Sequence, residues 1–234
     1  MERGRRARQE EDKLLRRRQL MAAAWGLFAG TAYADVTIAA VAARAGVAKG
    51  TLFLYFRTKE SLFLAIAEER LAAWFADLDD RLGELVRAGP PGPERVAAEL
   101  CDSLERHPGL TRLLAVLHGV LERNIDFATA LAFKQGLLAQ VTGTGRLLER
   151  CCPFLGPGQG AALLLRVHAL VIGLQQMADP APVVRDVLRE PGMQTLGISF
   201  GPTLRDTLAA LLVGLDHRQQ PAGEQPGYQQ RSTP

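Results

Sequence analysis

Residues 36–59, VTIAAVAARAGVAKGTLFLYFRTK, predict two short helices joined by a tight turn. Thr37 can cap the first helix, because its hydroxyl can accept a hydrogen bond from an unpaired backbone N–H of the first turn. Gly46 can take the positive φ that ends this helix. The second helix is expected from about residue 48 to residue 54, with Leu52 facing inward. This arrangement is that of a helix-turn-helix, whose second helix lies in the major groove of DNA.

The outward face of this segment has the chemistry that DNA binding needs. It contains no acidic residue and four basic ones, Arg44, Lys49, Arg57 and Lys59. Gly50 permits close backbone approach, and Thr51 offers a hydroxyl to phosphate and a methyl group to thymine. Tyr55 offers a hydroxyl at the helix end. The alternative is a helical hairpin in a small all-α core, because helical spacing alone is common to both.

Three runs of residues carry a resemblance to a known family: Thr37-Ile38, AGVAKGTLFLYF over 45–56, and KESL over 59–62. They resemble the DNA-binding domain of the TetR family of bacterial transcriptional regulators, over roughly residues 13–64. The resemblance implies an all-α homodimer, usually a repressor, that leaves its operator when a small molecule binds its C-terminal domain.

The resemblance also implies DNA contacts residue by residue. The recognition-helix contacts map to Lys49, Gly50, Thr51, Phe53 and Tyr55. Thr37 matches the family's phosphate-contacting helix start, and Lys59 matches its phosphate clamp. Arg44 is the remaining basic residue of the expected DNA-binding surface. Phe53 departs from the tyrosine that is frequent at its position, which removes one hydroxyl from the expected phosphate contacts.

Charge is distributed unevenly along the 234 residues, whose formal net charge is +3. Residues 1–59 hold twelve Lys or Arg against five Asp or Glu, whereas residues 60–234 hold sixteen against twenty. The asymmetry predicts that the N-terminal part meets a polyanion and that the rest does not. The apolar content of 47% and aromatic content of 6% fit an alanine- and leucine-rich helical protein with a sizeable core.

The chain is expected to fold as an all-α protein with four regions. These are a disordered basic arm over 1–12, a three-helix DNA-binding domain over 13–58, a helical ligand-binding and dimerisation domain over 59–218, and a disordered tail over 219–234. The arm either attracts DNA or is a solvated tail. Trp25 is expected inside the three-helix domain. Thr58 is expected to cap a long connecting helix without a capping-box partner at Ser61. Further helices are predicted over 94–106, 108–123, 126–151, 159–178 and 202–216, with a proline-rich connection over 179–201.

The helices over 159–178 and 202–216 are apolar on more than one face, which favours pairing with their copies in a four-helix dimer interface. The expected interface residues are Leu163, Val167, Leu170, Leu174, Leu204, Leu208, Leu211 and Leu215. Twofold symmetry would then present two recognition helices to a pseudo-palindromic double-stranded operator. The alternative is that both are core helices of a monomer.

A pocket for an unidentified, small and largely apolar ligand is expected among the helices between residues 94 and 178. Its candidate residues are His118, Phe127, Phe133, Gln140, His168, Gln175 and Met177. Ordinary core or surface positions are the alternative for each of them.

Other function classes lack their sequence signatures. Three cysteines, two of them adjacent, argue against a disulfide framework, and no metal-ligand spacing surrounds Cys151 and Cys152. No phosphate loop, nucleophile elbow or paired-carboxylate motif indicates an enzyme or a cofactor. No secretory signal or bilayer-spanning run is recognised, so a cytoplasmic location is expected. Two alternatives stay open: a DNA-binding protein without a small-molecule effector, controlled by a partner or organising the genome, and a helical interaction module that has lost DNA binding.

Overall fold

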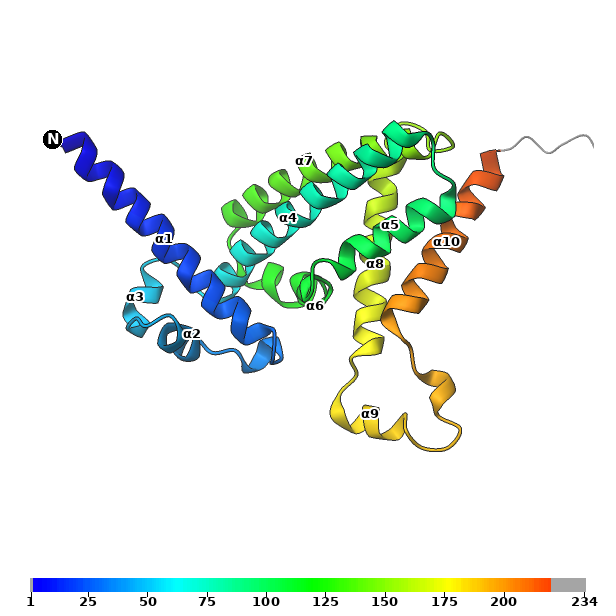
Figure 1. Ribbon diagram of the computed structural model, residues 1–234. Helices are drawn as coiled ribbons and strands as arrows, with labels where there is room; N and C mark the ends of the chain where they lie inside the picture. Colours follow the sequence, from blue (N-terminus) through cyan, green and yellow to red (C-terminus); the bar gives the residue numbers. More distant parts are fainter. Residues whose placement is uncertain (1, 220–234) are drawn as a thin grey trace, which may run out of the picture.

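The computed structural model describes residues 2–219, and within that range it contains helices and no strands, which confirms the all-α fold. The helices in chain order are α1 (Glu2–Phe28), α2 (Ile38–Arg44), α3 (Lys49–Phe53), α4 (Lys59–Ala88), α5 (Pro93–Glu105), α6 (Leu110–Val116), α7 (Phe127–Cys151), α8 (Gln159–Ala178), α9 (Pro182–Val187) and α10 (Phe200–Gln219). A π-helical segment, Leu117–Leu121, and a 3-10 segment, Glu122–Asn124, connect α6 to α7. The helices α1 to α3 lie at one end of the molecule, and α4 leads from them into the remaining helices (Figure 1).

The first three helices pack around side chains that are almost fully buried. Leu20 and Phe28 of α1 meet Val41 of α2 and Leu52 of α3, and none of the four is more than 1% exposed. Phe63 of α4 closes this core, with its ring edge-on to that of Phe28 at a centroid distance of 5.6 Å. The start of α4 is therefore part of the N-terminal three-helix domain as well as of the long helix that leaves it.

Local signals fix the two short helices as predicted. The Thr37 hydroxyl accepts a 3.1 Å hydrogen bond from the Ala40 N–H, which caps α2. Gly46 has φ +66, a conformation that costs glycine little, and it ends the helix.

The start of α4 carries a full capping box, which corrects the expectation that Ser61 takes no part. The Thr58 hydroxyl accepts a 3.0 Å hydrogen bond from the Ser61 N–H, and the Ser61 hydroxyl accepts a 3.2 Å bond from the Thr58 N–H. Serine thus fills the position that Glu or Gln usually occupies in this motif. The reciprocal bonds fix where the connecting helix begins.

Helices α7 and α8 cross so closely that their contact requires glycine. A Cβ added at Gly145 would lie 2.6 Å from the Ala161 backbone nitrogen, and one added at Gly160 would overlap the Gly145 carbonyl. These glycines therefore serve packing, and the crossing holds α7 and α8 together near one end of the bundle.

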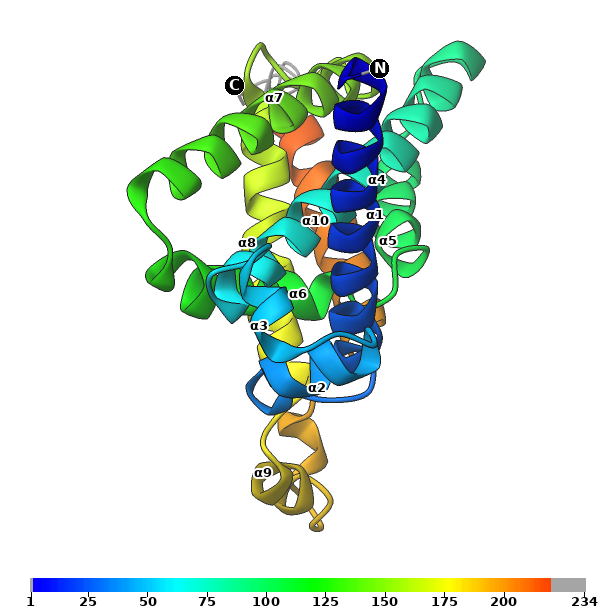
Figure 2. The same cartoon turned by 90° about the vertical axis from the view of Figure 1, so that its left-hand side faces the viewer.

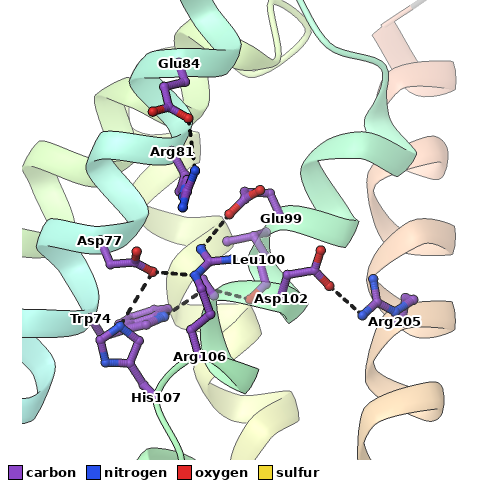
Figure 3. Close-up of polar contacts among 11 residues, drawn as sticks. Trp74, Asp77, Arg81, Glu84, Glu99, Leu100, Asp102, Arg106, His107 and Arg205 are labelled. Carbon is purple, nitrogen blue, oxygen red and sulfur yellow. Dashed lines mark hydrogen bonds and ion pairs between the residues drawn. The ribbon is translucent and has the colours of Figure 1, made fainter.

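Polar pairs join α5 to its two neighbours, α4 and α10 (Figure 3). The Arg106 guanidinium donates to the Glu99 carboxylate at 2.7 Å and to that of Asp77 in α4 at 3.0 Å. Arg205 of α10 donates to the Asp102 carboxylate at 2.7 Å. These contacts tie the last helix to the connecting helix through α5.

Three expectations about the chain's organisation need correction. Residues 2–12 belong to α1, where a disordered arm was expected. The connection over 179–201 contains α9 and a 3-10 turn, Gln194–Leu196. Trp25 is only half buried, because it lies between the domains, with the Arg70 guanidinium 4.8 Å from its ring centroid. The expected tail lies, from residue 220 onward, outside the described residues.

Among residues 2–219, one helix, α8, is long and apolar enough to cross a membrane by length and composition alone, with a mean hydropathy of 1.4. In the structure α8 packs against α6, α7 and α10, and 22% of its apolar stretch is buried.

Candidate nucleic-acid interface and ligand cavity

The recognition helix α3 is short and turns its polar side outward. Leu52 is fully buried and anchors it, while Lys49 and Gly50 are exposed and Phe53 is 43% exposed. The Lys49 ammonium lies 6.0 Å from the centre of the Phe53 ring. In Figure 2 this helix lies on the side of the molecule that faces the viewer. The face thus presents a cation, an aromatic edge and accessible backbone.

The remaining predicted contacts of the helix-turn-helix are less uniformly exposed. Thr51 and Tyr55 are half buried, and Tyr55 lies just beyond the end of α3. Thr37 is exposed although its hydroxyl caps α2. Arg44, in the last turn of α2, extends along α1, where a Cβ at Gly26 would lie 2.9 Å from its Nη2 atom. The absence of a side chain at Gly26 leaves room for this guanidinium.

Lys59 is engaged within the protein, in contrast to its expected role as a phosphate clamp. Its ammonium donates to the Tyr33 carbonyl and, at 3.4 Å, to the Ala34 carbonyl. It also lies 4.0 Å from the centre of the Tyr33 ring. Burial lowers the pKa of Lys59, although nearby Glu60 and Asp35 act in the opposite direction. Lys59 therefore ties the start of α4 to the segment between α1 and α2.

An apolar cavity of about 50 Å³ lies between α4, α5, α6, α7 and α8. Its walls are the side chains of Leu71, Trp74, Phe75, Leu104, Leu114, Leu117, Leu137, Val141, Leu164, Leu165, Val167, His168 and Val171. The indole N–H of Trp74 donates to the Ser103 hydroxyl at 2.9 Å, so this side chain offers the cavity its apolar ring (Figure 3). Among the wall residues that the structure describes, His168 is the one with a titratable side chain. The cavity is thus suited to an uncharged apolar group.

Of the predicted ligand residues whose side chains the structure describes, only His168 lines this cavity. Phe133 and Gln140 line a neighbouring hollow, together with Leu71 and Leu137, which belong to both. The Gln175 amide oxygen instead accepts a 2.9 Å hydrogen bond from the Thr111 hydroxyl.

Two further candidates are corrected, because they face outward: Phe127 is 81% exposed and Met177 is 54% exposed. The side chain of His118 lies outside what the structure describes. The wall residues of α4 and α7 that sequence reasoning missed belong to apolar helical stripes, a signal that could have identified them.

Half of the predicted dimer residues are already buried within the single chain. Leu163, Val167, Leu204 and Leu208 are at most 2% exposed, because α8 and α10 turn these sides into their own bundle. Their assignment to the dimer interface is therefore corrected. Leu170, Leu174, Leu211 and Leu215 are half buried against the core. The exposed residues on the accessible sides of α8 and α10 include Leu165, Arg166, Ala169, Gly173, Asp206, Ala210 and Gly214.

The three cysteines have structural surroundings. All are buried and free, and burial raises the pKa of Cys151 to about 11 and that of Cys152 to about 12. Within residues 2–219 no group of three or more His, Cys, Asp or Glu side chains is arranged to hold a metal ion. The adjacent thiols thus behave as small apolar side chains.

Two contacts connect the DNA-binding end to the wall of the cavity. The Arg112 guanidinium of α6 donates to the carbonyls of Phe28 and Ala29 at 3.3 Å and to that of Thr31 at 2.9 Å. Gly109, just before α6, has φ +83, and a Cβ there would lie 3.0 Å from the Trp25 ring. The end of α1 therefore rests directly on the start of α6, whose later residues line the cavity.

Comparison with known protein families identifies two consecutive domains in this chain. The domain described as bacterial regulatory proteins, tetR family, matches residues 20–66, and the domain described as tetracyclin repressor-like, C-terminal domain, matches residues 68–219. No match is found among the curated proteins.

Solved structures share the fold at low sequence identity. The fatty acid degradation regulator FadR from Bacillus halodurans has a TM-score of 0.55 and 17% identity, over 85% of this chain and 95% of that one. FadR from Bacillus subtilis in complex with stearoyl-CoA has a TM-score of 0.51 and 17% identity, over 83% and 96%. A TetR/AcrR-family regulator from Thermobifida fusca has a TM-score of 0.50 and 17% identity, over 85% and 96%. With both domains matched in sequence and the fold shared, the chain belongs to the TetR family of bacterial transcriptional regulators.

Proposed function

We propose that the protein is a homodimeric, sequence-specific repressor, acting in the cytoplasm, that leaves an inverted-repeat operator when a small apolar ligand binds it. The observation that carries the proposal is the outward face of α3, where Lys49, Gly50 and Phe53 are exposed while Leu52 anchors the helix. Such a face can reach base edges and phosphates in the major groove. Membership of a family of bacterial transcriptional regulators supports this assignment, and we propose no catalytic role for the chain.

The apolar cavity supports a ligand that carries no charge inside the protein. Burying a charge among these side chains would cost several kcal/mol or more, whereas an apolar group gains about 25 cal/mol for each Å² removed from water. The Bacillus subtilis neighbour, crystallised with stearoyl-CoA, is consistent with a long apolar chain as the ligand class.

Ligand and DNA would be coupled through the helices that serve both. Leu71 of α4 and Leu114 of α6 line the cavity, while the start of α4 and Arg112 of α6 contact the DNA-binding domain. A ligand that favours one placement of these helices shifts the population of DNA-competent dimers, by as much as its preference for that placement.

The accessible sides of α8 and α10 support dimerisation. Ala169 and Gly173 on α8, with Ala210 and Gly214 on α10, are exposed and small, which permits close approach of four helices. A twofold axis there would present two α3 helices to half-sites about 34–36 Å apart.

A DNA-binding protein without a small-molecule effector is the second candidate. The observation in its favour is the size of the cavity, because about 50 Å³ holds only a few water-sized groups and a larger ligand must widen it. Mass spectrometry of the purified protein for a bound apolar compound separates the two candidates. A protein that binds no DNA at all would point to a helical interaction module.

The DNA-binding face is tested with Lys49→Ala, measured by fluorescence anisotropy with a labelled duplex. We expect affinity to fall about five- to a hundredfold, equivalent to the ~1–3 kcal/mol of one specific contact, while sedimentation shows an intact dimer. Lys134→Ala is the matched control, because it removes the same charge from α7, where Lys134 pairs with Glu122. Equal affinity of both variants and the wild type would remove α3 from the interface.

A further inference from the structure

Helix α1 begins well before the part of it that packs in the DNA-binding domain. Leu20 is the first buried residue of this helix, and the described side chains of residues 8–19 are exposed apart from that of the half-buried Arg17. The match to the tetR-family domain also begins at residue 20. The preceding turns therefore contribute little to the core and lie outside the matched domain.

One side of this extension faces the segment that follows the recognition helix. Residues of α1 line an open hollow together with Tyr55, which lies directly after α3; they are Gln9, Asp12, Lys13, Leu15, Arg16 and Gln19. Helical periodicity places Arg8 on the same side, one turn before Asp12. In Figure 1 the N-terminal half of α1 extends beyond α3, at the end of the molecule that carries α1 to α3.

Cations outnumber anions on this side, with Arg8, Lys13 and Arg16 against Asp12. All four residues are exposed. Lys13 pairs with Glu10 at 3.0 Å and Arg16 donates to Gln19 at 2.9 Å, but exposed pairs of this kind contribute little and exchange readily for other partners. Their cationic groups are therefore accessible to phosphate.

We propose that the strip formed by Arg8, Lys13 and Arg16 binds the phosphate backbone of double-stranded DNA beside the base pairs read by α3. Eight residues of helix separate its ends, which corresponds to ~12 Å, the rise of three to four base pairs. The strip lengthens the duplex that each subunit contacts without reading its sequence. The inference rests on the proposed DNA binding by α3, and it assigns to α1 contacts that α3 cannot reach.

The test compares the triple variant Arg8→Gln, Lys13→Gln, Arg16→Gln with the wild type on two duplexes. One duplex carries only the inverted repeat selected by the protein, and the other extends it by about six base pairs at each end, which exceeds the reach of the strip. Glutamine keeps helix propensity close to that of Arg and Lys, and circular dichroism checks the fold.

We expect the variant to bind the long duplex about tenfold or more weakly than the wild type does, and to bind the short duplex equally well. On the long duplex its salt dependence should also weaken, by about 0.9 in the log–log slope for each phosphate that the strip no longer neutralises. Arg18→Gln is the matched control, since Arg18 is exposed on the same helix but does not line the hollow.

Asp12→Asn should act in the opposite direction, raising affinity for the long duplex because it removes a carboxylate that lies beside the three cations of the strip. A merely structural role of the extension would not produce this gain. Equal affinity and salt slope of the triple variant and the wild type on the long duplex would overturn the proposal, as would equally weakened binding to both duplexes. The result that would contradict DNA binding by α3 is a different one. In that case the Lys49→Ala variant would bind both duplexes as tightly as the wild type does.

Discussion

The Arg112 guanidinium lies 2.9 Å from the backbone carbonyl oxygen of Thr31, so a side chain of α6 holds the segment that follows α1. The same guanidinium lies 4.9 Å from the centre of the Phe28 ring. Cations stabilise the free carbonyls at a helix C-terminus, where the helix dipole is negative. We therefore expect a movement of α6 to reach the DNA-binding domain through these hydrogen bonds as well as through packing.

Arg112→Ala should uncouple the two domains. We expect ligand to change operator affinity by a smaller factor than in the wild type, and unfolding to cost about 1–3 kcal/mol less, because the variant lacks these charged hydrogen bonds. Anisotropy titrations with and without ligand measure the first effect, and urea unfolding measures the second. Arg95→Ala removes an exposed arginine elsewhere and should change neither. An unchanged ligand response in Arg112→Ala would show that coupling takes another route.

Filling the cavity should remove the ligand response and leave DNA binding in place. Val141→Phe places a ring among the wall residues, at a cost of about 1–3 kcal/mol for overpacking. We expect this variant to bind the operator normally but to bind no apolar compound, tested with a series of increasing length that begins with benzene. Leu138→Phe adds the same ring one turn away at a position that is 65% exposed, and it should retain the ligand response. If the same compounds released the Val141→Phe variant from the operator, the ligand would have to bind at a site other than this cavity.

The crossing of α7 and α8 predicts opposite effects for two glycine substitutions. Gly160→Ala forces the helices apart and should lower the free energy of unfolding by about 1–3 kcal/mol. Gly143→Ala, also helical but with no atom within 4 Å of the added Cβ, should raise it by about 0.5–1 kcal/mol. Denaturant unfolding measures the change in unfolding free energy for each variant. Equal changes in the two variants would contradict the close crossing of α7 and α8.

The buried thiols predict a decrease in stability at alkaline pH. The pKa of Cys151 is raised from 9.0 to about 11, so the folded chain keeps protons that the unfolded chain has released. The unfolded state then binds fewer protons, and stability falls as pH rises from about 9 through 11. Below about pH 8 the thiols contribute almost no pH dependence, because they stay protonated in both states. Urea unfolding at about pH 8 and about pH 10 should show a smaller decrease for the double variant Cys151→Ala, Cys152→Ala than for the wild type. An identical decrease would mean that other groups cause it.

Short-range features of the fold were predictable because they depend on neighbouring residues. The cap at Thr37, the turn at Gly46 and the inward Leu52 follow from local hydrogen bonding and helical spacing. The capping box of Thr58 and Ser61 was missed because serine is unusual at its second position, where Glu or Gln is common. The helical extension of α1 was missed because its basic composition resembles that of a solvated tail, whereas Arg, Lys and Glu are also good helix formers.

Long-range features were harder to predict. Helix α8 is apolar on several sides. The spacing of its apolar residues does not tell which side packs within the protomer and which side remains accessible. Leu163 was therefore assigned to a dimer although it is fully buried in the protomer. The cavity draws its walls from helices far apart in sequence, so Leu71 and Val141 gave no joint signal. Lys59 was placed by resemblance, and only the structure reveals its bonds to the carbonyls before α2.

The proposed function requires that this chain reads a symmetric DNA sequence as a dimer. Selection of bound duplexes from a random library with the purified protein, followed by sequencing, tests this requirement. We expect an enriched inverted repeat with half-site centres about one helical turn, or a multiple of it, apart. No enrichment at low salt, from a protein that is folded and dimeric, would contradict it.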